Sequence, residues 1–145
     1  MRQSGMTLIE LLIVLLLLST VSAIGWNSLR RFRDAAALQE AANAVTRVLN
    51  LGRAAAMSRR ETIGLRAGTG ELLLVAGDSA VIARLGIGPG AEVPVDSVRV
   101  RPATIRFNSR GHAGAGSIYL WRRGVTVRLV CNFLGRVRRE VLSGP

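Results

Sequence analysis

The chain has 145 residues, enough for one compact domain with an appended segment and too few for two full domains. Its net charge is +11 and every basic residue is an arginine; the last 45 residues hold nine arginines against one acid, Glu140. Such a surface suits an anionic partner, whether nucleic acid, anionic lipid or an acidic protein. The lone cysteine, Cys131, excludes an intrachain disulfide, and its apolar neighbours predict that it is buried.

The N-terminal segment combines a short polar leader, residues 1–5, with an apolar run that extends from Met6 to about Trp26. As a helix, this run would span roughly 32 Å, enough to cross a hydrocarbon core of about 30 Å. Glu10 lies within it, although a carboxylate in a spanning helix costs on the order of 2.5–3.5 kcal/mol. A secretory signal peptide cut after Ala23, or a plain membrane anchor, would give Glu10 no role.

The segment Gly5-Met6-Thr7-Leu8-Ile9-Glu10 resembles the class III leader junction of type IV pilins and type II secretion pseudopilins. The resemblance implies that a prepilin peptidase cuts between Gly5 and Met6 and N-methylates Met6. It also implies that Glu10 pairs with the N-terminal amine of a neighbouring subunit. Two charges that are each costly in lipid would then neutralise one another, so Glu10 would favour assembly and set its register. Met6 and Asn27 stand where the family often has Phe and Pro.

From Ser28 to about Arg59, apolar residues recur at spacings of three and four, which predicts that the helix continues as an amphipathic second half. Many of these residues are alanines, which would let a sheet pack close to the helix. Gly25 is the only helix-weakening residue near the junction of the two halves.

After Met57 the hydrophobic period changes to two, and Gly-rich and Pro-rich segments separate short apolar runs. Eight strands are expected, over 62–65, 72–75, 81–85, 97–101, 104–107, 118–121, 125–130 and 136–141. The fold class is therefore α+β, a long helix packed on a head with a meandering antiparallel β-sheet, which under the resemblance is the type IV pilin-like fold. The expected segments are a leader (1–5), a transmembrane filament-core helix (6–27), the amphipathic half of the helix (28–60) and the β head (61–145).

The head resembles the GspH/FimT class of pilin-like proteins. The matching pieces are, in order, 53–60 with 62–65, 104–111, 127–130 and Gly135-Arg136-Val137-Arg138. In FimT-type minor pilins, a C-terminal Gly-Arg-x-Arg segment is associated with DNA binding during natural transformation. The resemblance implies the same role for this basic hairpin. GspH pseudopilins of type II secretion share the segment, and there its arginines carry no DNA role, so both functions stay open.

Strand geometry sharpens the DNA hypothesis. If Arg136 and Arg138 lie in a strand, their side chains project from one face about 6.6 Å apart. Arg128 on the preceding strand, with Arg139, would add to the same basic surface, and Gly135 would close the hairpin. These arginines would hold the phosphates of duplex DNA without reading its bases. Alternatively, they serve only to stabilise the hairpin.

No constellation of residues indicates an enzyme. His112 is expected to be a solvated loop side chain, and the absence of a Cys/His cluster with metal-ligand spacing predicts neither metal nor cofactor. The acids are too scattered for a general acid–base pair. Tyr119, Trp121 and Phe133 could stack on bases, but their placement along strands favours packing in the core.

The resemblance also implies partners and location. Other pilin-like subunits, a prepilin peptidase, the inner membrane and duplex DNA are the expected partners. The protein would cross the inner membrane once, export its head to the periplasm and enter a pilus or pseudopilus. A signal-peptide-exported soluble binding protein, starting at Ile24, remains a third possibility.

Overall fold

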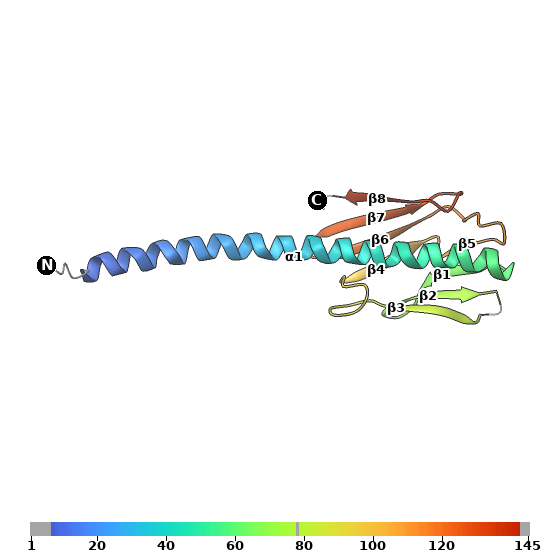
Figure 1. Ribbon diagram of the computed structural model, residues 1–145, viewed down its shortest axis with the longest axis horizontal. Coiled ribbons are helices and arrows are strands. Elements are labelled where there is room, and N and C mark those ends of the chain that lie inside the picture. The colour runs from blue at the N-terminus through green and yellow to red at the C-terminus, as the bar shows by residue number, and fades with distance from the viewer. Residues whose placement is uncertain (1–6, 78, 143–145) are drawn as a thin grey trace. The chain divides into compact units, whose positions relative to one another are not determined.

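The computed structural model describes residues 7–77 and 79–142 (Figure 1). A single long helix, α1 (Leu8–Arg59), is followed by strands. They are β1 (Ile63–Ala67), β2 (Glu71–Ala76), β3 (Val81–Gly86), β4 (Ser97–Arg101), β5 (Thr104–Phe107), β6 (Gly116–Arg122), β7 (Val125–Cys131) and β8 (Val137–Leu142). The chain divides into two compact units, residues 1–35 and 36–145. The predicted helix and the eight strands are thus confirmed, with ends that move by one or two residues at most strands.

The first unit holds the N-terminal part of α1. The helix begins after Thr7, whose hydroxyl and carbonyl oxygens both accept from the Glu10 N–H, at 3.3 and 3.1 Å. Thr7 therefore caps N–H groups that lack a partner in the first turn. The apolar side chains beyond it are exposed, and the mean hydropathy reaches 2.5 over a stretch long enough to cross a membrane. The helix continues without interruption through Gly25.

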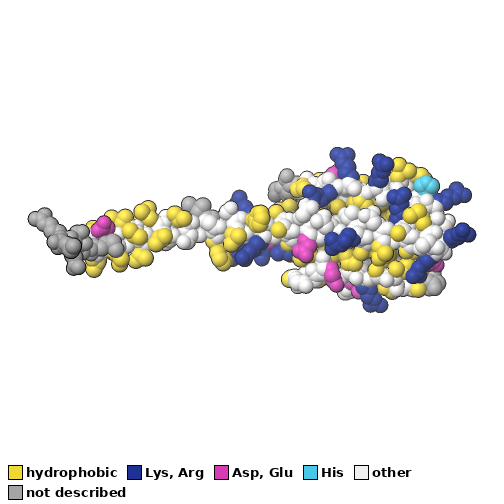
Figure 2. All heavy atoms as spheres, viewed as in Figure 1, with side chains coloured by type: hydrophobic (Ala, Val, Ile, Leu, Met, Phe, Trp, Pro, Cys, Tyr) yellow, Lys and Arg dark blue, Asp and Glu magenta, His cyan; other side chains and the backbone are white. Residues whose placement is uncertain are grey.

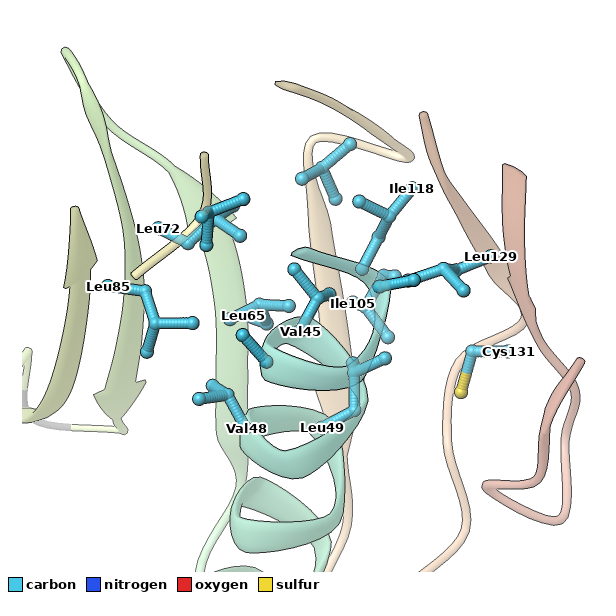
Figure 3. Packing of buried hydrophobic residues seen from close by; sticks show 14 of the residues in the cluster. Val45, Val48, Leu49, Leu65, Leu72, Leu85, Ile105, Ile118, Leu129 and Cys131 are labelled. Carbon is cyan, nitrogen blue, oxygen red and sulfur yellow. The ribbon is translucent and has the colours of Figure 1, made fainter. Parts of the chain in front are cut away.

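The second unit begins within α1 and contains the hydrophobic core. From Leu38 onward α1 buries one stripe of small and aliphatic side chains, as the periodicity predicts. Figure 3 shows Val45, Val48 and Leu49 projecting from the helix among core side chains of the strands. The approach is closest at Gly52, where a Cβ atom would lie 2.8 Å from Leu74 Cδ1 and 3.3 Å from Phe107. Glycine at this position lets helix and sheet pack closely.

The strands form two antiparallel four-stranded sheets, in the orders β3-β2-β1-β5 and β4-β6-β7-β8. The expected single meander is interrupted where the chain changes sheet, between β3 and β4, between β4 and β5, and between β5 and β6. β5 pairs with β1, and β4 pairs with β6. Ile105 and Phe107 of β5 are fully buried, and Phe107 lies beside Gly52 of α1.

The aromatic residues of the head lie outside the core, with the exception of Phe107. Trp121 is 50% exposed and Phe133 is 62% exposed, while Tyr119 is half-buried. The expectation that these three side chains pack in the core is therefore wrong. Aliphatic residues and alanines fill the interior between helix and sheets, and the large aromatic rings are left for the surface.

Candidate functional site

The basic C-terminal hairpin is formed by β7 and β8, which pair from Cys131↔Val137 to Thr126↔Leu142. Its turn is closed by three hydrogen bonds. The Asn132 N–H donates to the Arg136 carbonyl (3.0 Å), the Gly135 N–H to the Asn132 carbonyl (2.9 Å), and the Arg136 N–H to Asn132 Oδ1 (2.9 Å). Gly135 has φ +73°, a left-handed conformation that favours glycine. The turn chemistry thus requires Asn at its first position and Gly at its fourth.

A second turn of the same design lies beside the first. The Asn108 N–H donates to the His112 carbonyl, the His112 N–H returns a bond to Asn108 Oδ1, and Gly111 has φ +78°. The two turns touch: the Ala113 N–H donates to the Phe133 carbonyl at 2.9 Å, and the His112 ring stacks on Phe133 at 4.8 Å. His112 is consequently half-buried, whereas the sequence predicted a solvated side chain.

Both turns rest on Arg53 of α1. A Cβ atom at Gly135 would lie 3.0 Å from Arg53 Cδ, and one at Gly111 would lie 3.2 Å from Arg53 Nε. Arg53 Nε is buried and makes no hydrogen bond within residues 7–77 and 79–142. This contact packs the tip of the hairpin against α1. The arginines that follow the turn therefore lie on a hairpin that is anchored to the helix.

Arg128 is held in place rather than free. Its Nε and Nη2 atoms donate to Ser117 Oγ at 3.1 and 3.0 Å, and its Nη1 lies 3.7 Å from Glu140 Oε2. The guanidinium also lies 5.7 Å from the centre of the Tyr119 ring, within cation–π range. Arg128 shares the outer face of its sheet with Thr126 and Val130, opposite the buried Val127 and Leu129.

The other three arginines take different positions. Arg138 lies on the outer face and is 83% exposed, with Nε 3.9 Å from Glu140 Oε1. Arg136 is exposed and stands in the turn, one residue before β8 begins, so the 6.6 Å strand spacing predicted for Arg136 and Arg138 does not apply. Arg139 lies on the opposite face, where its guanidinium donates to Gln39 Oε1 of α1. The structure thus brings Arg128 and Arg138 together and separates Arg139 from them.

Two further arginines, which the sequence analysis did not single out, extend this face. Arg99 and Arg101 of β4 stand opposite Tyr119 and Ser117 of β6, which in turn stand opposite Arg128 and Val130 of β7. Alternation of Val and Arg along β4 could have signalled an exposed basic edge. The pairing of β4 with β6 joins that edge to the hairpin. We call the outer surface of β4, β6, β7 and β8 the basic face; Figure 2 shows arginines spread over the β part of the chain.

Cys131 is buried, as the sequence predicts. Burial raises the pKa of its thiol, an effect that the positive charge of Arg53 partly opposes. Across the described ranges, no three His, Cys, Asp or Glu side chains come together in a way that could hold a metal ion. Gly5 and Met6, the predicted cleavage and methylation residues, lie outside the described residues.

Comparison with known proteins agrees with this architecture. Residues 1–26 match the family described as the prokaryotic N-terminal methylation motif. The chain thus combines this motif with a helix apolar enough to span a membrane and with a two-sheet head. The motif agrees with the pilin-type leader junction that the sequence resembles, and the fold is type IV pilin-like.

Two solved structures have a fold similar to that of this chain. Both are crystal structures of the type IV minor pilin FimU from Pseudomonas aeruginosa PAO1, in two crystal forms. The first aligns with a TM-score of 0.61 at 17% identity, over 78% of this chain and 98% of FimU. The second aligns with a TM-score of 0.57 at 17% identity, over 74% and 98%. No curated protein is similar enough in sequence to match.

Proposed function

We propose that this protein is a minor type IV pilin that binds DNA without sequence preference through the basic face and the adjoining turn. The observation that supports this proposal most is the exposure of Arg138 and Arg136 on a hairpin anchored to α1. Arg99 and Arg101 lie on the same sheet face, at its opposite edge. Arginine forks suit phosphate oxygens, and contacts to phosphates supply affinity without sequence readout. Arg128 lies on the same face, where its guanidinium donates to Ser117 Oγ and lies over the Tyr119 ring.

Assembly completes the proposal. A prepilin peptidase would cut between Gly5 and Met6 and methylate Met6, and the apolar half of α1 would hold the subunit in the inner membrane with its head exported. Glu10 would then pair with the amine of a neighbouring subunit as subunits leave the membrane, which removes the cost of two isolated charges in lipid. The match of residues 1–26 to the methylation motif supports this step.

Binding to duplex DNA tests the role of the hairpin. The full chain in a non-ionic detergent would be titrated with duplexes of several sequences over a range of salt concentrations. We expect similar affinities for all sequences and weaker binding as salt rises. In Arg136→Ala/Arg138→Ala, the loss of two phosphate contacts should make the log–log salt slope shallower by about 1.8.

A matched control separates the hairpin from net charge. Arg66→Ala/Arg84→Ala removes the same charge from the other sheet, and Arg84 lies 3.9 Å from Glu71 just as Arg138 lies 3.9 Å from Glu140. This control should bind nearly as wild type. Glu140→Gln should bind more tightly, because the carboxylate that competes with phosphate for Arg128 and Arg138 is gone.

Two outcomes would overturn the DNA proposal. One is no binding at low salt, and the other is an equal loss in the hairpin variant and in its charge-matched control. Either result would make a GspH-type pseudopilin of a type II secretion system the better assignment. The third possibility, a soluble exported protein, is checked by mass spectrometry of the native chain: an N-methylated Met6 supports the pilin, and a chain that starts at Ile24 contradicts it.

A further inference from the structure

We propose that the basic face binds single-stranded DNA by stacking a base on Trp121. This inference rests on the proposed DNA-binding function and deepens it, since it names the form of DNA that the face is built to hold. It adds the aromatic rings of β6 to the arginines of the basic face, whereas the test of duplex binding above depends on Arg136 and Arg138 of the hairpin.

The strand register arranges the basic face as three rows across four strands. From β4 to β8, the rows are Arg101–Ser117–Val130–Arg138, Arg99–Tyr119–Arg128–Glu140 and Ser97–Trp121–Thr126–Leu142. Four arginines and one glutamate give this surface a net charge of +3, with two aromatic rings on the central strand β6. In the middle row, the aromatic Tyr119 lies between Arg99 and Arg128 on one face of the sheet.

Trp121 is exposed because its neighbours are small. It is 50% exposed, and the residues beside it on the adjacent strands are Ser97 and Thr126. Neither side chain is large enough to cover an indole. The result is an open groove of about 510 Å³ lined by Ser97, Arg99, Arg101, Tyr119, Trp121 and Thr126. An apolar ring that the fold leaves uncovered in a basic groove indicates a ligand that is both flat and anionic.

The rest of the groove supplies a second ring and the charges for a phosphate backbone. Tyr119 lies two residues from Trp121 on the same strand face, about 6.6 Å away at the usual rise per residue. Its ring is already paired with the Arg128 guanidinium at 5.7 Å. Arg99 and Arg101 line the β4 side of the groove, and neither makes an ion pair with another described residue. Their charges are therefore available to phosphates.

The chemistry favours unpaired strands over duplexes. In a duplex, each base is stacked between its neighbours, so a ring on a flat protein surface reaches only the backbone. In a single strand, the face of a base can lie on an aromatic side chain while arginines hold the phosphates, and such stacking tolerates any sequence. Open four-stranded antiparallel sheets with exposed aromatic rings are used in this way for single-stranded RNA.

Fluorescence of Trp121 tests the contact directly. The chain has two tryptophans, so Trp26→Phe leaves Trp121 as the only indole. This variant, full length in a non-ionic detergent, would be titrated with oligothymidylate of about ten nucleotides and with a duplex of the same length. We expect the single strand to quench the Trp121 emission strongly, and the duplex to quench it little at matched saturation.

Affinities measured by anisotropy of labelled DNA complete the test. Trp121→Ala should weaken single-strand binding by about five- to hundred-fold and leave duplex binding nearly unchanged, while Trp121→Phe retains most of the affinity. Phe133→Ala is the matched control, since it removes another exposed ring that lies in the turn and away from the groove. It should bind oligothymidylate as wild type does.

The outcomes separate this inference from the proposed function. Unchanged Trp121 emission at saturation, or equal losses in Trp121→Ala and Phe133→Ala, would overturn the stacking contact. If duplex binding still falls in Arg136→Ala/Arg138→Ala, the DNA-binding function stands without the stacking site. If neither form of DNA binds, the proposed function and the stacking site are both overturned.

Discussion

The turn at the tip of the hairpin predicts that Gly135→Ala destabilises the second unit more than Gly124→Ala does. Both glycines have left-handed backbones, with φ +73° and +83°. An alanine in this conformation costs about 1–2 kcal/mol. At Gly124 no atom lies within 4 Å of the added methyl group, so backbone strain is the whole cost.

At Gly135, the added methyl group would also come too close to neighbouring atoms. It would lie 3.0 Å from Arg53 Cδ and 3.3 Å from the Gly111 carbonyl oxygen, a backbone atom that cannot rotate away. Overpacking of this kind adds about 1–3 kcal/mol. We therefore expect a loss of roughly 2–5 kcal/mol for Gly135→Ala, against about 1–2 kcal/mol for Gly124→Ala.

Thermal unfolding of the full chain in a non-ionic detergent, followed by near-ultraviolet circular dichroism, measures the difference. A domain of about 100 residues loses roughly 4 °C in Tm per kcal/mol. The expected losses are about 4–8 °C for Gly124→Ala and about 8–20 °C for Gly135→Ala. Adding Arg53→Ala to Gly135→Ala should leave a smaller loss than the two single changes predict together. Equal losses at both glycines would refute the packed contact between the turn and Arg53.

Four other predictions follow from single residues. Glu10→Ala should allow leader cleavage but reduce incorporation into sheared filaments; normal incorporation would contradict the pairing of Glu10 with an N-terminal amine. Gly52→Ala should lower Tm despite a gain of about 1 kcal/mol in helix propensity, because the methyl lies 2.8 Å from Leu74 Cδ1; an unchanged Tm would mean that Leu74 moves aside. Burial raises the pKa of the Cys131 thiol above its usual 9.0, so the unfolded chain loses this proton at lower pH than the folded one. The stabilisation is present below pH 9 and is lost as pH rises above it, so wild type should lose unfolding free energy relative to Cys131→Ala as the pH is raised above 9. A constant difference would count against burial. Arg139→Ala should leave duplex affinity closer to wild type than Arg138→Ala does, because Arg139 faces Gln39 of α1; a loss as large as that of Arg138→Ala would place Arg139 in the binding surface.

By itself the sequence determined the features that depend on local physics. The apolar run with Glu10 in it, the change of hydrophobic period after Met57 and the Gly-rich turns were enough to predict the helix, the eight strands and the N-terminal methylation motif. Gly135 indicated the hairpin turn because the conformation of a turn depends on residues that are neighbours in the sequence. The basic C-terminal segment was visible for the same reason.

Only the tertiary structure decided which strands share a sheet and which side chains share a face. Hydrophobic alternation predicts which residues of β4 point outward. It does not predict that β4 pairs with β6 while β5 pairs with β1. In the folded chain, Phe107 of β5 lies against Gly52 of α1, a contact between residues far apart in the sequence. Arg99, Arg101 and Trp121 join the hairpin arginines on the basic face, and Arg139 is turned toward α1, because strand register is a non-local property.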